Sequence, residues 1–369
     1  MLLKKWSDIL TIVNGKNQKD VVSPDGQYPI YGSGGVIGYA TSYLCEAGTT
    51  IIGRKGTINN PIFVDKKFWN VDTAFGISPG KELIPKFLYY FCCSFNFTEL
   101  DKSTTIPSLA KRDLLQIKMP VPSIEEQERI VSKIEELFSR LDASVAELQT
   151  AKEKLKIYRQ TVLYKAFQNL TDTITMDEVA DMIDPQPSHR TPPEVSNGVP
   201  YVGVGDIDYS ARKINFAEAR KVSSSVLKEH QERYTIHKGD FIMGKIGTIG
   251  KPFMVPLPQN YTLSANVILI QPNYTKILPE FLYWQFSAPL VTQQLTVGAA
   301  ATSQPAFGIK KARLLSIRIC DIEQQRQITN EIEKSLSVCD SIEQTIDISL
   351  HQAEALRQSI LKRAFEGEL

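Results

Sequence analysis

The stretch SIEEQERIVSKIEELFSRLD at residues 123–142 returns in altered form as DIEQQRQITNEIEKSLSVCD at residues 321–340. Both copies begin with a residue that caps helices well, Ser123 or Asp321, and both continue with Ile-Glu and a Gln. The offset between the copies is 198 residues, more than half of the 369-residue chain. A repeat at this distance predicts a structural unit that is written twice.

Both copies predict long helices that pair as a coiled coil. In the first copy, apolar and small residues recur every seven positions in two rows, which are Ile130, Leu137, Ser144, Ala151, Tyr158 and Ile134, Leu141, Leu148, Leu155, Val162. The second copy carries both rows 198 positions later. About five heptads without a gap are typical of coiled-coil helices, and a helix of this length needs a partner. We expect an antiparallel pair within the chain; the alternative is that each helix packs on the domain that precedes it.

The segments before the two helices also repeat, more faintly. GTTIIGRKGT at 48–57 corresponds to GDFIMGKIGT at 239–248. IPKFLYYF at 84–91 likewise corresponds to LPEFLYWQF at 278–286. The repeated unit is therefore a globular domain followed by a long helix.

Each globular domain is expected to mix short strands with helices. Its β-branched and aromatic runs are punctuated by Gly, Pro and Asn, and helices are predicted at 84–97 and 278–288. The fold class expected is α+β, with two pseudo-symmetric mixed α/β domains separated by two long helices that form an antiparallel coiled coil. The expected boundaries are 1–122 for domain 1, 123–170 for helix 1, 171–320 for domain 2 and 321–369 for helix 2.

The composition describes a globular, water-soluble protein. Hydrophobic residues make up 42% and charged residues 22%, and no apolar run approaches the roughly 20 residues of a membrane span. The five Cys include no CxxC pair and the N-terminus lacks a signal-peptide core, so we expect reduced thiols, a cytoplasmic location and no membrane partner. Residues 1–120 hold 14 Lys/Arg against 10 Asp/Glu, which permits nucleic-acid binding without demanding it.

No motif of covalent chemistry stands out. The four His form neither HExxH nor a cluster with Cys, and no Ser sits in a GxSxG elbow. GKIGTIGKP at 244–252 has the wrong spacing for a phosphate loop, and DPQP at 184–187 lacks the aromatic residue of the amino-methyltransferase motif. We therefore predict no catalytic residue, no metal site and no cofactor, and favour a binding role over an enzymatic one.

The candidate contacts for a nucleic acid lie on basic, glycine-flanked loops. GRKGT at 53–57 and GKIGT at 244–248 predict a strand followed by a tight turn with glycines at positive φ. Their cations could meet phosphates or guanine, while GSGG at 32–35 and SHRTPP at 188–193 offer backbone amides and a second basic loop. For each basic residue, ordinary solvated surface explains the sequence equally well. The candidates are Ser33, Gly34, Arg54, Lys55, Thr57, Lys111, Arg112, His189, Arg190, Lys245, Thr248, Lys310 and Lys311.

The order domain–helix–domain–helix, with an IEEQ or IEQQ segment closing each domain, resembles the specificity (S) subunits of type I restriction–modification systems. YPIYGSGGVIG at 28–38, GRKGTINNP at 53–61 and the terminal LRQSILKRAFEGEL carry the resemblance further. It implies a non-catalytic reader of double-stranded DNA in which each domain recognises one half of a bipartite site. It also implies that the helices set the spacing and dock two methyltransferase (modification) subunits, which bring the cofactor, and that restriction/translocase subunits join the complex.

Two other functions fit parts of the same sequence. An assembly scaffold whose two domains bind proteins would have the same helices without sequence-dependent DNA affinity. A methyltransferase in its own right ranks third because the chain lacks a GxGxG-type cofactor loop. The loops of the two domains differ at most positions, so neither half of a DNA site can be inferred from the other.

Overall fold

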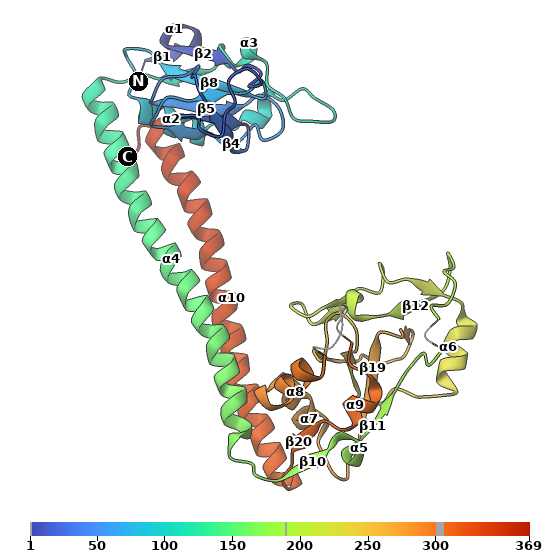
Figure 1. The fold of residues 1–369 in the computed structure, drawn as a ribbon. Helices are drawn as coiled ribbons and strands as arrows, with labels where there is room; N and C mark the ends of the chain where they lie inside the picture. The colour runs from blue at the N-terminus through green and yellow to red at the C-terminus, as the bar shows by residue number, and fades with distance from the viewer. Residues whose placement is uncertain (1, 189, 300–305) are drawn as a thin grey trace. The chain divides into compact units, whose positions relative to one another are not determined.

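The computed structural model describes residues 2–188, 190–299 and 306–369. The chain divides into two compact units. Unit 1 comprises the residues through Thr150 together with Ile346–Leu369, and unit 2 comprises Ala151–Thr345. Each long helix, α4 (Ile124–Gln168) and α10 (Ile322–Glu366), contributes one part to each unit (Figure 1).

Unit 1 is built on a four-stranded antiparallel sheet of order β2-β8-β5-β6. A three-stranded sheet, β4-β3-β7, and the two-stranded ribbon β1-β9 complete it. Its elements before α4 are β1 (Leu3–Lys5), α1 (Trp6–Ile9), β2 (Leu10–Asn14), β3 (Tyr28–Gly32), β4 (Gly35–Ala40), β5 (Thr49–Gly53), β6 (Ile62–Val64), β7 (Trp69–Asn70), β8 (Ala74–Pro79), α2 (Pro85–Ser94), η1 (Phe97–Leu100), α3 (Lys111–Leu114) and β9 (Lys118–Pro120).

Unit 2 repeats this plan with sheets of order β11-β19-β16-β17 and β15-β12-β18 and the ribbon β10-β20. Among the described residues, the additional elements are the 3-10 helix η2, the ribbon β13-β14 and the helices α6 and α8, while the 3-10 helix η1 of unit 1 has no counterpart. Its elements before α10 are β10 (Thr173–Thr175), α5 (Met176–Val179), β11 (Ala180–Ile183), β12 (Val199–Val202), η2 (Val204–Asp206), β13 (Ile207–Asp208), β14 (Lys213–Ile214), β15 (Lys221–Val222), α6 (Ser224–Gln231), β16 (Phe241–Gly244), β17 (Pro252–Met254), β18 (Thr262–Leu263), β19 (Val267–Pro272), α7 (Pro279–Ser287), α8 (Pro289–Ala299), α9 (Ile309–Arg313) and β20 (Ser316–Arg318).

The matching sheets confirm the expected α+β fold with a duplicated unit. In both three-stranded sheets one pair is parallel, β3 with β7 and β12 with β18, whereas the neighbouring pair is antiparallel. The short helices expected after the sheets are present as α2 and α7, each with Pro at its first turn, where the missing N–H leaves no bond unmade.

The long helices pair antiparallel in each unit and also pack on the domain. In unit 1, Ile134 of α4 and Leu361 of α10 lie in one core with Trp6. In unit 2, Phe167 of α4 and Ile332 of α10 share a core with the domain residues. Both packing modes considered for the helices therefore occur together.

The contact row between the helices differs from the two heptad rows that the sequence predicts. The row from Ile134 to Val162 is at least half-buried throughout, but Ser144, Ala151 and Tyr158 of the other row are exposed. A four-residue step replaces a three-residue step after Leu141, so that the second row continues as Val145, Lys152 and Arg159. Such a stutter changes which residues face the partner because it alters the local period of the helix.

The same step recurs 198 positions later and places charges on the contact row of α10. Glu343 is partly buried there, whereas Ile342 is exposed. Arg159 reaches Glu343 at 3.0 Å and Asp340 at 2.8 Å in unit 2. In unit 1, Arg357 pairs with Asp142 and lies over the ring of Phe138. Ion pairs therefore fix the register where the predicted row has small or apolar residues.

A buried glutamine in the first turn of each long helix explains the Gln that both copies share. Gln127 accepts from Ile84 N at 2.9 Å and donates to the carbonyls of Glu82 and Pro122. Gln325 makes the same three bonds in unit 2, with Leu278 N and the carbonyls of Lys276 and Cys320. Each glutamine thus links its long helix to the loop that directly precedes the short helix of the same domain, α2 or α7.

Candidate nucleic-acid interface

The loops after β5 and β16 have matching backbones that only glycine can build. A Cβ on Gly53 would lie 2.0 Å from Thr57 O, and one on Gly244 would lie 2.0 Å from Thr248 O. Gly56 and Gly247 have φ of +82° and +78°, as the sequence predicts for these turns. The backbone therefore presents the side chains between these glycines on a short, tight loop.

In unit 1 the candidate residues gather on three adjoining loops. Ser33 lies beside the 53–57 loop, since a Cβ on Gly53 would be 3.0 Å from its Cβ. The 53–57 loop also bonds to the segment before α3, because Gly56 N donates to Pro107 O at 2.9 Å. Gly34, Arg54, Lys55 and Thr57 are exposed on this surface.

Two of the unit 1 cations line one pocket of about 490 Å³. The Arg54 Nη1 donates to the carbonyl of Asp72 at 3.0 Å, and the Lys111 Nζ donates to the carbonyl of Ile12 at 2.7 Å. The side chain of the neighbouring Arg112 is 83% exposed, and its Nε lies 3.6 Å from Asp113 Oδ1. These bonds to backbone carbonyls orient the side chains of Arg54 and Lys111, whereas the side chain of Arg112 extends into solvent.

In unit 2 the corresponding cation is enclosed. Lys245 is 7% exposed, and its Nζ lies 2.8 Å from Asp184 Oδ2. Thr248 and Lys310 are exposed, and Lys311, also exposed, donates to Gly298 O at 2.9 Å. The loop and α9 adjoin as in unit 1, because Phe307 N donates to Lys245 O.

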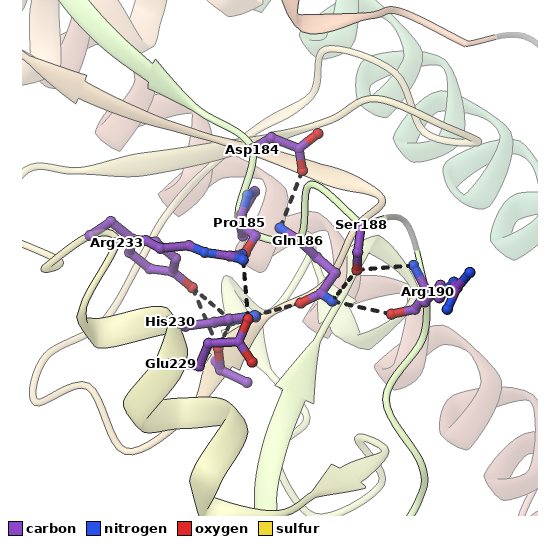
Figure 2. A network of polar contacts seen from close by, with 10 residues as sticks. Asp184, Pro185, Gln186, Ser188, Arg190, Glu229, His230 and Arg233 are labelled. Carbon is purple, nitrogen blue, oxygen red and sulfur yellow. Dashed lines mark hydrogen bonds and ion pairs between the residues drawn. The ribbon is translucent and has the colours of Figure 1, made fainter.

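The basic loop at 188–193 is tied to α6 through Gln186, which is buried (Figure 2). Its Nε2 donates to Ser188 Oγ at 2.7 Å and to Arg190 O at 3.2 Å. The Arg190 side chain is exposed, so its main chain is held while the guanidinium remains accessible. His189 lies outside the described residues.

His230 of α6 is a buried partner of this loop that sequence reasoning did not find. Its Nε2 lies 2.5 Å from Gln186 Oε1, an acceptor, so the Nε2 carries the proton. Its Nδ1 accepts from the hydroxyl of Thr262. Burial lowers the pKa of His230, which favours the neutral ring that the network requires. A single His on a short helix carries no sequence signal for such a role.

The described residues show neither a metal cluster nor a membrane-crossing helix. Among positions 2–188, 190–299 and 306–369, no three His, Cys, Asp or Glu side chains gather as metal ligands would. Over the same positions, no helix is both long enough and apolar enough to cross a bilayer. The candidate residues that the structure describes lie on loops and short helices that carry several exposed basic side chains.

Two copies of one α+β unit, each with a share of two long helices, define a two-domain protein built by duplication. The family model for the type I restriction modification DNA specificity domain matches residues 3–153 and 172–352. The chain belongs to this family.

Named relatives and a solved structure agree with this assignment. The chain is 24% identical over 349 residues to the EcoBI type I restriction enzyme specificity subunit of Escherichia coli, covering 86% of this chain and 73% of that protein. It is 22% identical over 361 residues to a putative type I specificity subunit of Haemophilus influenzae, covering 95% and 91%. A solved chain from a type I restriction–modification system, studied for complex assembly and conformational transition, has a TM-score of 0.75 at 18% identity, covering 100% of this chain and 98% of its own.

Proposed function

We propose that this chain is the DNA sequence-recognition subunit of a type I restriction–modification complex and is itself non-catalytic. The observation that carries the proposal is the duplicated loop surface within the specificity-domain family. The proposed reading domains are residues 1–122 and 171–320. Each would read one half of a bipartite site on double-stranded DNA.

The differences between the two loop surfaces support two different half-sites. Arg54 is exposed whereas Lys245 is enclosed by Asp184, although both follow equivalent strands. Ser33 beside Gly53 is replaced in unit 2 by Val204, whose Cγ1 lies 2.8 Å from the Cβ position of Gly244. Since base discrimination depends on donor and acceptor patterns, these changes would alter the bases preferred.

The long helices are proposed to set the spacing between half-sites and to dock two methyltransferase subunits. They expose apolar side chains that do not pack within the pair of helices. Ile157, Tyr158 and Tyr164 of α4 are 68%, 53% and 55% exposed. Exposed apolar side chains of this kind would be covered if a partner protein packed on the helix. Restriction/translocase subunits would join the same complex.

The proposed DNA contacts are the candidate residues of both units other than Lys245. Lys245 is assigned to positioning its loop through Asp184 rather than to a direct contact. In unit 1 the contacts are Ser33, Gly34, Arg54, Lys55, Thr57, Lys111 and Arg112; in unit 2 they are His189, Arg190, Thr248, Lys310 and Lys311.

The test is a footprint and a methyl-transfer assay with the chain, its methyltransferase partner and both together. We expect the complex to protect two short blocks of one sequence and the chain alone to transfer no methyl group. Equal binding to every sequence would instead favour an assembly scaffold. Methyl transfer by the purified chain would contradict the non-catalytic assignment.

A further inference from the structure

Arg54 and Lys245 occupy the same position in the two copies of the fold. Arg54 N donates to Thr73 O at 2.8 Å, and Arg54 O accepts from Leu109 N at 2.9 Å. Lys245 makes the matching bonds, with Asn266 O at 2.9 Å and Phe307 N at 2.8 Å. The two backbones are therefore equivalent, and the difference between the sites lies in their side chains.

The residue that faces each cation differs in charge. Asn14 and Asp184 each come five positions after the short helix that opens their domain, at the end of β2 and just after β11. In unit 2, Asp184 forms an ion pair with Lys245, and their side chains are only 16% and 9% exposed. In unit 1, a neutral amide stands in place of that carboxylate.

The unit 1 pocket consequently concentrates positive charge. Asn14, Gly15, Phe75, Leu109 and Ala110 line it together with Arg54 and Lys111, and no carboxylate is among them. Both cations are fixed by backbone carbonyls, which orient their N–H groups without neutralising the charge.

The second cation does not distinguish the two units. Arg313 takes the place of Lys111 in unit 2, where its Nη2 donates to Met182 O at 3.1 Å. Met182 corresponds to Ile12, whose carbonyl binds Lys111. The two sites therefore differ mainly in that unit 2 contains its own anion.

We propose that the Arg54–Lys111 pocket of unit 1 binds one phosphodiester of the DNA backbone, and that Asp184 removes the equivalent site from unit 2. This inference rests on the proposed function. Two oriented cations suit a phosphate, because charge-assisted hydrogen bonds from Arg and Lys to phosphate oxygens are short and strong. One domain would thus be anchored on the duplex by a contact that the other lacks.

The test measures binding of the full chain with its methyltransferase partner to a duplex carrying the mapped site, as a function of KCl concentration. Arg54→Gln removes the cation, and Asn14→Asp keeps both cations while supplying the carboxylate that unit 2 has. Each variant should weaken binding and reduce the slope of log K against log [KCl] by about 0.9, the value for one lost phosphate contact.

The matched control is Lys81→Gln, which removes an exposed lysine of unit 1 that is not among the proposed contacts. It should leave both the slope and the thermal unfolding midpoint unchanged. A slope that falls equally in this control, or that stays unchanged in both Arg54→Gln and Asn14→Asp, overturns the proposal.

Single methylphosphonate substitutions identify the anion as a backbone phosphate. One position should reproduce the reduced slope in the wild-type complex and have no further effect in Arg54→Gln. Absence of any such position overturns the assignment to DNA backbone. A scrambled duplex separates the two levels of the account, because equal wild-type affinity for mapped and scrambled sequences refutes the proposed function itself.

Discussion

At the scale of single residues, the glutamine in the first turn of each long helix couples helix and domain. The side chains of Gln127 and Gln325 are fully buried, with no measurable exposure. Each satisfies one N–H and two carbonyl groups, which would otherwise be buried without partners. An unpaired buried polar group costs about 1–3 kcal/mol.

Replacing Gln127 with Ala should therefore lower the free energy of unfolding by about 1–3 kcal/mol, measured by urea denaturation of the chain. The exposed Gln149 on the same helix provides a control, and Gln149→Ala should change it by no more than about 0.5 kcal/mol. Equal effects of the two substitutions would show that the bonds of Gln127 add nothing to stability.

Because of His230, the free energy of unfolding of unit 2 should depend on pH. Burial lowers its pKa in the folded state below the ordinary value of about 6.5, so the unfolded chain takes up the proton first. The stabilising contribution of neutral His230 is then fully present above about pH 6.5. It is lost as the pH falls from there through the lowered pKa of the folded state. Urea unfolding at several pH values should show a decline that His230→Asn reduces, whereas His351→Asn, at an exposed position, should retain it. A decline that persists unchanged in His230→Asn would assign it to other groups.

At the scale of elements, the repeat predicts the two long helices because the same cap, glutamine and heptads are written twice. The stutter escapes prediction, since counting in sevens assumes a constant period and Ser144 and Tyr158 continue the count. The same limit applies to the site. The loops at 53–57 and 244–248 follow from their glycines, but the enclosure of Lys245 depends on Asp184, 61 positions away.

The stutter predicts opposite results for two neighbouring substitutions. Leu155 lies on the contact row and is 8% exposed, whereas Tyr158 is 53% exposed. Leu155→Ala should cost about 2 kcal/mol or more in the chain alone, because a buried leucine leaves a cavity. Tyr158→Ala should cost less than about 0.5 kcal/mol, as exposed positions do. A larger loss at Tyr158 than at Leu155 in denaturant unfolding would restore the uninterrupted heptad row.

At the scale of the whole molecule, the chain combines two copies of one fold with loop side chains that differ between the copies. Units 1 and 2 share their strand order, the backbones of the loops at 53–57 and 244–248, and the glutamine that bonds each long helix to its domain. The side chains on these loops differ. Two domains with the same sheets and the same helix packing can therefore carry two different loop surfaces.

The most direct measurement is a genome-wide map of methylated bases in a host that carries this chain and its methyltransferase partner. The map is repeated after residues 1–122 are exchanged for the equivalent domain of another family member, and again after exchange of residues 171–320. We predict a bipartite methylated sequence in which each exchange alters one half and leaves the other half and the spacing unchanged. A single exchange that alters both halves, or a host without sequence-specific methylation, would contradict the account.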